Sequence, residues 1–140
     1  MKKLIFTAIL FTILNTNLSF GQEKAKELPV PNVTLCGATK DMDMVKYADL
    51  LKCDELMLPY KQLKIKSFTF SYAVPAENKK DGIFIDINNT GSKFNNQILD
   101  ILKTAEAKKV SRLLIENVIV IDTDGKTERK FAGINIKVQK

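Results

Sequence analysis

Two cysteines, Cys36 and Cys53, are the residues whose number and spacing say most about chemistry. They lie too far apart in the sequence for a CxxC redox motif. An even cysteine count favours a structural disulfide in an oxidising compartment, and two buried free thiols are the alternative. Between these two states, we predict the disulfide Cys36–Cys53.

Acid–base and metal chemistry is limited because the chain contains no histidine. Histidine is the usual general base near neutral pH and the commonest metal ligand. A Ser-His-Asp triad and an imidazole-ligated metal site are therefore excluded. A carboxylate pair or an activated lysine could still act, but no spacing of Asp and Glu singles one out. We expect a protein that is not an enzyme and that needs no cofactor.

One acidic segment, Asp122-Thr123-Asp124-Gly125, begins like a calcium-binding loop. An EF-hand places its glycine at the sixth position of the loop, whereas Gly125 is fourth here and apolar segments flank it. We therefore interpret Asp124-Gly125 as the tight turn of a β-hairpin and predict no metal site.

The formal net charge of +6 comes from lysines that are spread along the chain. Lys64 and Lys66, for example, alternate with apolar residues, which is typical of the solvated face of a strand. A nucleic-acid-binding surface would need its basic residues gathered on one face. We predict no nucleic-acid partner.

Residues 1–21 have the layout of an export signal. Two lysines precede an apolar stretch from Leu4 to Leu14, and Gly21 stands before Gln22. The apolar part is short for a membrane span, which needs roughly 20 residues. An uncleaved anchor reaching Phe20 is the alternative, but it would contain two asparagines. We expect cleavage, a mobile polar leader over residues 22–28, one domain over 29–140 and membrane contact by association only.

The pattern of apolar residues predicts the elements of this domain. Alternation dominates, so we expect a mainly β fold, antiparallel and sandwich-like, with one or two short helices. The predicted strands are Val33–Cys36, Gln62–Val74, Ile83–Ile87, Leu113–Ile121 and a return strand containing Phe131 to Val138. The predicted helices are one of about ten residues within Asp41–Leu56, capped by Asp41 or Asp43, and one at 95–105.

Two positions carry sharper local signals. The apolar face of the long strand changes phase at Lys66-Ser67, which predicts a β-bulge or two strands meeting at a corner. Asn95 can cap the second helix, with Phe94 and Leu99 as a hydrophobic staple. The residues expected to be buried are Phe68, Phe70, Tyr72, Ile98, Leu102, Ile115, Ile119, Ile134 and Ile136.

Three stretches, taken in order, resemble one known domain. Leu63–Phe70 is similar to an F-x-V-x-S-F-T-V strand, and Gly91–Leu99 to a G-x-x-F-[ST]-x-x-Q-x-x-L-I helix start. Leu114–Val118, followed by Asp122–Lys126 and Arg129, is similar to a strand with an I-x-x-x-G-P-D-G-x-x-R turn. These are features of the carboxy-terminal domain of GldM, a periplasmic core protein of bacterial gliding motility and type IX secretion. The glycine after the helix is absent here. GldM has a transmembrane anchor and several preceding periplasmic domains, whereas we expect a single domain behind a signal in this chain.

The resemblance implies an exported, non-enzymatic protein-interaction module of the bacterial cell envelope, periplasmic or secreted, with an envelope protein as its partner. A small exported ligand-binding or inhibitor protein is the alternative. We expect the contact surface at an exposed strand edge or at the loops Val74–Gly82 and Asp86–Ser92, which contain Lys79, Lys80 and Asn89.

Overall fold

The computed structural model describes residues 33–140. The predicted export signal, the leader and the first residues of the domain lie outside the described residues. In chain order the elements are β1 (Thr34–Leu35), β2 (Met44–Lys46), α1 (Tyr47–Leu50), β3 (Leu56–Met57), β4 (Lys64–Ala76), β5 (Lys79–Thr90), α2 (Asn96–Thr104), β6 (Arg112–Ile121), β7 (Glu128–Phe131) and β8 (Ile134–Gln139).

Most of the chain forms one six-stranded sheet. Its strands follow the order β2-β8-β6-β4-β5, and β7 pairs with β6 outside this path. All of its pairings are antiparallel except that of β2 with β8. β1 and β3 form a separate two-stranded sheet. The prediction of a mainly antiparallel β fold with one or two short helices is confirmed.

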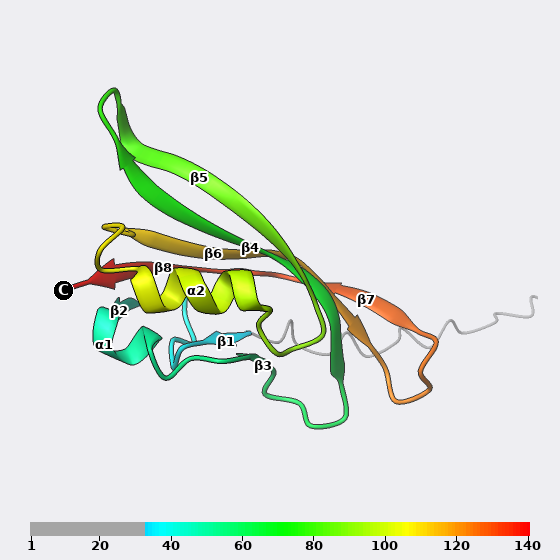
Figure 1. The fold of residues 1–140 in the computed structure, drawn as a ribbon. Helices are drawn as coiled ribbons and strands as arrows, with labels where there is room; N and C mark the ends of the chain where they lie inside the picture. Colours follow the sequence, from blue (N-terminus) through cyan, green and yellow to red (C-terminus); the bar gives the residue numbers. More distant parts are fainter. Residues whose placement is uncertain (1–32) are drawn as a thin grey trace, which may run out of the picture.

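A second layer, made of α1, α2 and the small sheet, lies along one side of the large sheet (Figure 1). The tip of the β4–β5 hairpin projects away from this second layer. The core lies between the layers. Within it, the Phe94 ring at the start of α2 meets the rings of Phe68 and Phe70 from β4, at centroid distances of 6.0 and 6.1 Å.

Two bulges set which residues face this core. The β4–β6 register shifts between Ile65 and Ser67, which confirms the bulge predicted at Lys66-Ser67. The register shifts a second time between Ser67 and Thr69, opposite Asn117, which has a φ of 51°.

The second bulge changes the inward set of β6. Val118 and Val120 are fully buried and Ile119 is half-buried, because the extra residue moves the inward phase by one position. The prediction that Ile119 belongs to the core was therefore wrong. The other eight residues expected to be buried are buried.

The helix predicted within Asp41–Leu56 is mostly absent. Its first part is β2, which pairs in parallel with β8, and only Tyr47–Leu50 is helical. Neither aspartate caps that helix: Asp41 accepts a hydrogen bond from the Asn135 N–H at 2.9 Å, and Asp43 accepts from the N–H groups of residues 39 and 40. Pairing with a distant strand overrides the local helical spacing.

The second helix starts as predicted. Asn95 caps α2 by accepting the Ile98 N–H at 3.0 Å. Ile98, Ile101 and Leu102 form its buried stripe. The predicted return strand, by contrast, is divided into β7 and β8 at Gly133, where a Cβ atom would lie 1.6 Å from the Ile115 carbonyl oxygen.

Candidate interaction surface

β5 is an open edge of the large sheet. It lies at one end of the strand order and, within residues 33–140, pairs with β4 alone, from Ser67↔Thr90 to Ala76↔Lys79 with a register shift after Val74. β2, at the opposite end, has only three residues. A long edge strand presents unpaired backbone N–H and C=O groups that can bind another strand. β5 therefore offers the longer free backbone edge of this sheet.

Hydrogen bonds at the end of β5 show which of its residues direct their backbone N–H and C=O groups away from β4. The Gly91 N–H donates to the Lys66 carbonyl, so odd-numbered residues point towards β4. Since neighbours on a strand alternate in direction, the N–H and C=O groups of Phe84 and Asp86 point outward. The Asn88 carbonyl fits this pattern because it accepts from the Asn95 side chain, at 3.1 Å, and not from β4.

Apolar side chains flank this edge on both faces. Ile83, Phe84 and Ile85 are 46%, 40% and 41% exposed. Ile83 and Ile85 lie opposite Val74 and Tyr72, on the face that carries the core, whereas Phe84 lies on the other face. Adjacent exposed apolar residues along a free edge are typical of a binding site and not of a solvated surface.

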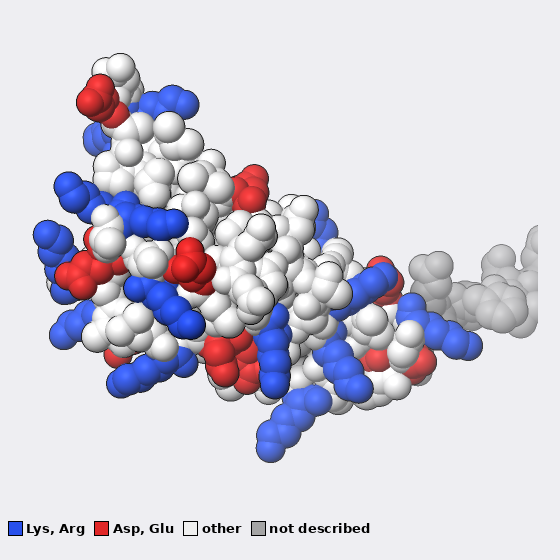
Figure 2. Space-filling model, in the orientation of Figure 1, with Lys and Arg blue, Asp and Glu red and all other residues white. Residues whose placement is uncertain are grey.

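Lys79 and Lys80 stand at the tip of the hairpin, where β5 begins, and both are exposed. Gly82 bends the strand just after them: its φ is +77°, and a Cβ atom there would lie 2.3 Å from the Val74 carbonyl oxygen. Below its charged tip the projecting hairpin is largely uncharged in Figure 2, and elsewhere on that face Lys and Arg are interspersed with Asp and Glu.

The segments predicted to be interaction loops are mainly strand. β4 extends to Ala76 and β5 covers Lys79–Thr90, so the expected short strand Ile83–Ile87 is longer at both ends. Asn89 is only 3% exposed. Its Nδ2 donates to the carbonyls of Gly91 and Lys93, and its Oδ1 accepts from the Asn95 N–H. Asn89 thus connects β5 to α2 and does not lie on an open loop.

The disulfide Cys36–Cys53 is present, with the two Cα atoms 5.0 Å apart. It links the turn after β1 to the segment after α1. Beside it lies an open cleft of about 630 Å³, and the residues that line it include four acidic ones, Asp43, Asp49, Asp54 and Glu55, together with Lys52, Met44 and Met57. Within residues 33–140, no group of His, Cys, Asp and Glu is arranged to hold a metal ion.

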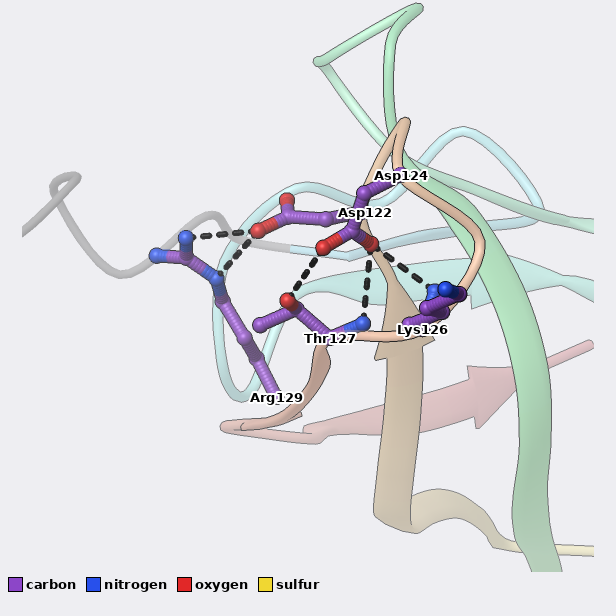
Figure 3. Close-up of polar contacts among 5 residues, drawn as sticks. All are labelled: Asp122, Asp124, Lys126, Thr127 and Arg129. Carbon is purple, nitrogen blue, oxygen red and sulfur yellow. Dashed lines mark hydrogen bonds and ion pairs between the residues drawn. The ribbon is translucent and has the colours of Figure 1, made fainter.

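The segment that begins like a calcium loop is a hairpin turn, as predicted (Figure 3). Asp124 Oδ1 accepts the N–H groups of Lys126 and Thr127, each at 2.8 Å. Arg129 donates two hydrogen bonds to Asp122 Oδ2, at 3.0 and 2.6 Å. The Thr127 hydroxyl and these backbone bonds lower the pKa of Asp124 to about 2. The Asp124 carboxylate therefore binds groups of the turn, and the Asp122 carboxylate binds Arg129 of β7.

No protein-family model matches the sequence, and a comparison with curated proteins finds no match. Among the described residues, no helix is long and apolar enough to span a bilayer. The disulfide indicates an oxidising, extracytoplasmic environment.

Proposed function

We propose that this protein is an exported, non-catalytic interaction module of the bacterial cell envelope. The observation that carries the proposal is the open edge of β5, with Ile83, Phe84 and Ile85 exposed beside free backbone groups. Proteins that bind an extended segment by strand addition obtain affinity from such backbone groups and specificity from the flanking side chains.

A periplasmic or secreted location is part of the proposal. The export-signal layout of residues 1–21 and the disulfide both support it. A role beside gliding or secretion components rests on the resemblance to the GldM carboxy-terminal domain alone. Two of the resembling stretches correspond to the first part of β4 and to the start of α2. The residues of β4 that pair with Ile83 and Ile85, Val74 and Tyr72, lie outside these stretches.

The experiment is affinity capture from envelope extracts with four baits. These are the unchanged protein, Ile85→Lys at the edge, the double variant Lys79→Ala/Lys80→Ala at the tip, and Met57→Lys, which adds the same charge at another exposed apolar residue. We expect an envelope protein that binds the unchanged protein and the Met57 variant but not the Ile85 variant. Equal recovery by all four baits would remove β5 as the contact surface, and no recovery by any would remove the proposed function.

A small exported ligand-binding protein is the second candidate, favoured by the cleft beside the disulfide. The lining carboxylates would suit a cationic ligand. Spermidine, used as a cationic probe, should then raise the melting temperature, and Asp49→Asn/Asp54→Asn should abolish that rise. An unchanged melting temperature would reject this candidate for polyamine-like ligands.

A further inference from the structure

We infer that the β5 edge binds the β5 edge of a second copy of this chain, antiparallel and with Ile85 on the two-fold axis. This inference rests on the proposed role of the same edge as a contact surface. A two-fold dimer sets identical strands side by side in opposite directions, so the six-stranded sheets of two copies would join into one continuous sheet.

The free hydrogen-bonding groups select this register. Only residues that point outward can pair with a second copy, and in the regular part of β5 these are Phe84 and Asp86. Further pairing is blocked on one side by the bend at Gly82 and on the other by the Asn95 side chain, which occupies the Asn88 carbonyl. With Ile85 on the axis, Phe84 of each copy lies opposite Asp86 of the other, and each of these residues both donates and accepts.

The side chains agree with the same register. On the face that carries the core, Ile85 meets Ile85 of the second copy, and each Ile83 meets the other copy's Ile87. Ile83 and Ile85 are exposed, and Ile87 is half-buried. On the opposite face the two Phe84 rings are diagonal neighbours, which is within the reach of aromatic side chains. The pairing thus covers the three exposed apolar residues of the edge together.

The charges permit this arrangement, and the bend at Gly82 disfavours a shift of the register. Because the strands run in opposite directions, the tips that bear Lys79 and Lys80 lie at opposite ends of the dimer. Asp81, at the same end, is paired with Arg112 at 3.9 Å. A register with Ile83 on the axis would instead pair Gly82 of each copy with Phe84 of the other, and the bend at Gly82 disfavours that pairing.

Self-pairing would use the same backbone groups as strand addition by an envelope protein. The two states therefore exclude each other, and the second copy acts as a reversible cover for the edge. The contact involves only a short stretch of β5 from each chain, with Phe84 and Asp86 as the pairing residues, so we expect a weak dimer whose population depends on concentration.

The first test is sedimentation velocity of the purified chain over a hundredfold range of concentration. We expect a monomer–dimer equilibrium whose dissociation constant rises about tenfold or more in Ile85→Lys. Met57→Lys, with the same added charge, should leave it unchanged. Phe84→Pro is a second variant: it removes an outward N–H without removing a bond to β4, and it should also weaken the dimer while the far-UV circular dichroism stays the same.

The second test fixes the register by cross-linking. A non-hydrogen-bonded antiparallel pair brings Cα atoms to about 4.5 Å, within the range of a disulfide. Ile85→Cys should therefore form a reducible dimer under mild oxidation, whereas Ile83→Cys should not, because Ile83 faces a different residue. A monomer at every concentration, a dimer unaffected by Ile85→Lys, or cross-linking through Ile83→Cys alone would overturn the inference.

The outcomes separate this inference from the proposed function. A purified chain that stays monomeric, together with an envelope partner that depends on Ile85, would reject the dimer and keep the function. A dimer that depends on Ile85, without any captured envelope protein, would keep the dimer and reject the function.

Discussion

Replacing Asn89 with alanine tests how β5 is joined to α2. Asn89 is 3% exposed, and its Nδ2 donates to the carbonyls of Gly91 and Lys93 at 3.1 and 2.9 Å. Its Oδ1 accepts from the Asn95 N–H at 2.9 Å. A hydrogen bond contributes about 1 kcal/mol net, and a buried group left without a partner costs about 1–3 kcal/mol. We therefore expect Asn89→Ala to lower the free energy of unfolding by about 2–4 kcal/mol.

Asn89→Asp separates the contribution of the accepting Oδ1 from that of the donating Nδ2. A carboxylate can still accept from the Asn95 N–H, but it cannot donate to the two carbonyls and is repelled by them. The folded state should therefore favour the protonated acid, which raises the pKa of the introduced carboxyl above its ordinary value of about 4. The stability of this variant should be greatest below that ordinary value and should fall as the pH rises through the raised pKa.

The assay is urea denaturation of the oxidised protein, followed by far-UV circular dichroism at pH 4 and pH 7. Asn78→Ala, an exposed change in the turn of the β4–β5 hairpin, is the matched control and should stay within about 0.5 kcal/mol of the unchanged protein. A loss of less than about 1 kcal/mol for Asn89→Ala, or an Asn89→Asp variant as stable as the unchanged protein at pH 7, would refute the reasoning.

Three further predictions concern stability. Phe70→Ala removes a fully buried ring and should cost about 3–5 kcal/mol in urea denaturation; a cost below about 2 kcal/mol would contradict its place in the core. Cys36→Ser/Cys53→Ser should lower the free energy of unfolding by about 3 kcal/mol in the loop-entropy model. Thiol titration of the unchanged protein, denatured without reduction, should find no free thiol, and two free thiols would contradict the disulfide. The Thr127 hydroxyl lowers the pKa of Asp124 to about 2. The ionised Asp124 carboxylate therefore stabilises the fold fully above the ordinary pKa of 3.8, and this stabilisation is lost as the pH falls through 2. The advantage over Asp124→Ala should accordingly shrink below pH 4, and an advantage that does not change with pH would contradict this.

Local signals in the sequence predicted the features that neighbouring residues determine. The change of phase at Lys66-Ser67, the Asn95 cap and the Asp124-Gly125 turn all depend on a few consecutive side chains, and each was confirmed. The pairing of Cys36 with Cys53 followed from the cysteine count and the predicted export, and it too was confirmed.

Features that depend on distant residues were not predictable in this way. Met44 has a helical spacing to its neighbours but pairs with Lys137, so β2 is specified by the far end of the chain. Asn88 and Asn89 were predicted to lie in a loop, and asparagine is rare in strands, yet both belong to β5 and pair with Thr69 and Phe68 of β4. The candidate surface was only partly predicted: Lys79 and Lys80 lie beside it, but no local pattern shows that β5 is the strand left at the edge.

The parallel pairing of β2 with β8 determines when the sheet can be completed. The Asp41 carboxylate and the Asn135 N–H that it binds are 94 residues apart, and β8 is the last strand that the structure describes. During synthesis from the N terminus, β2 therefore has no partner strand within residues 33–140 until β8 has been made. Contacts of such long range slow folding, to milliseconds or seconds in β-rich domains. The six-stranded sheet is complete only when β8 is present, whereas Cys36 and Cys53, 17 residues apart, can pair before β8 has been made.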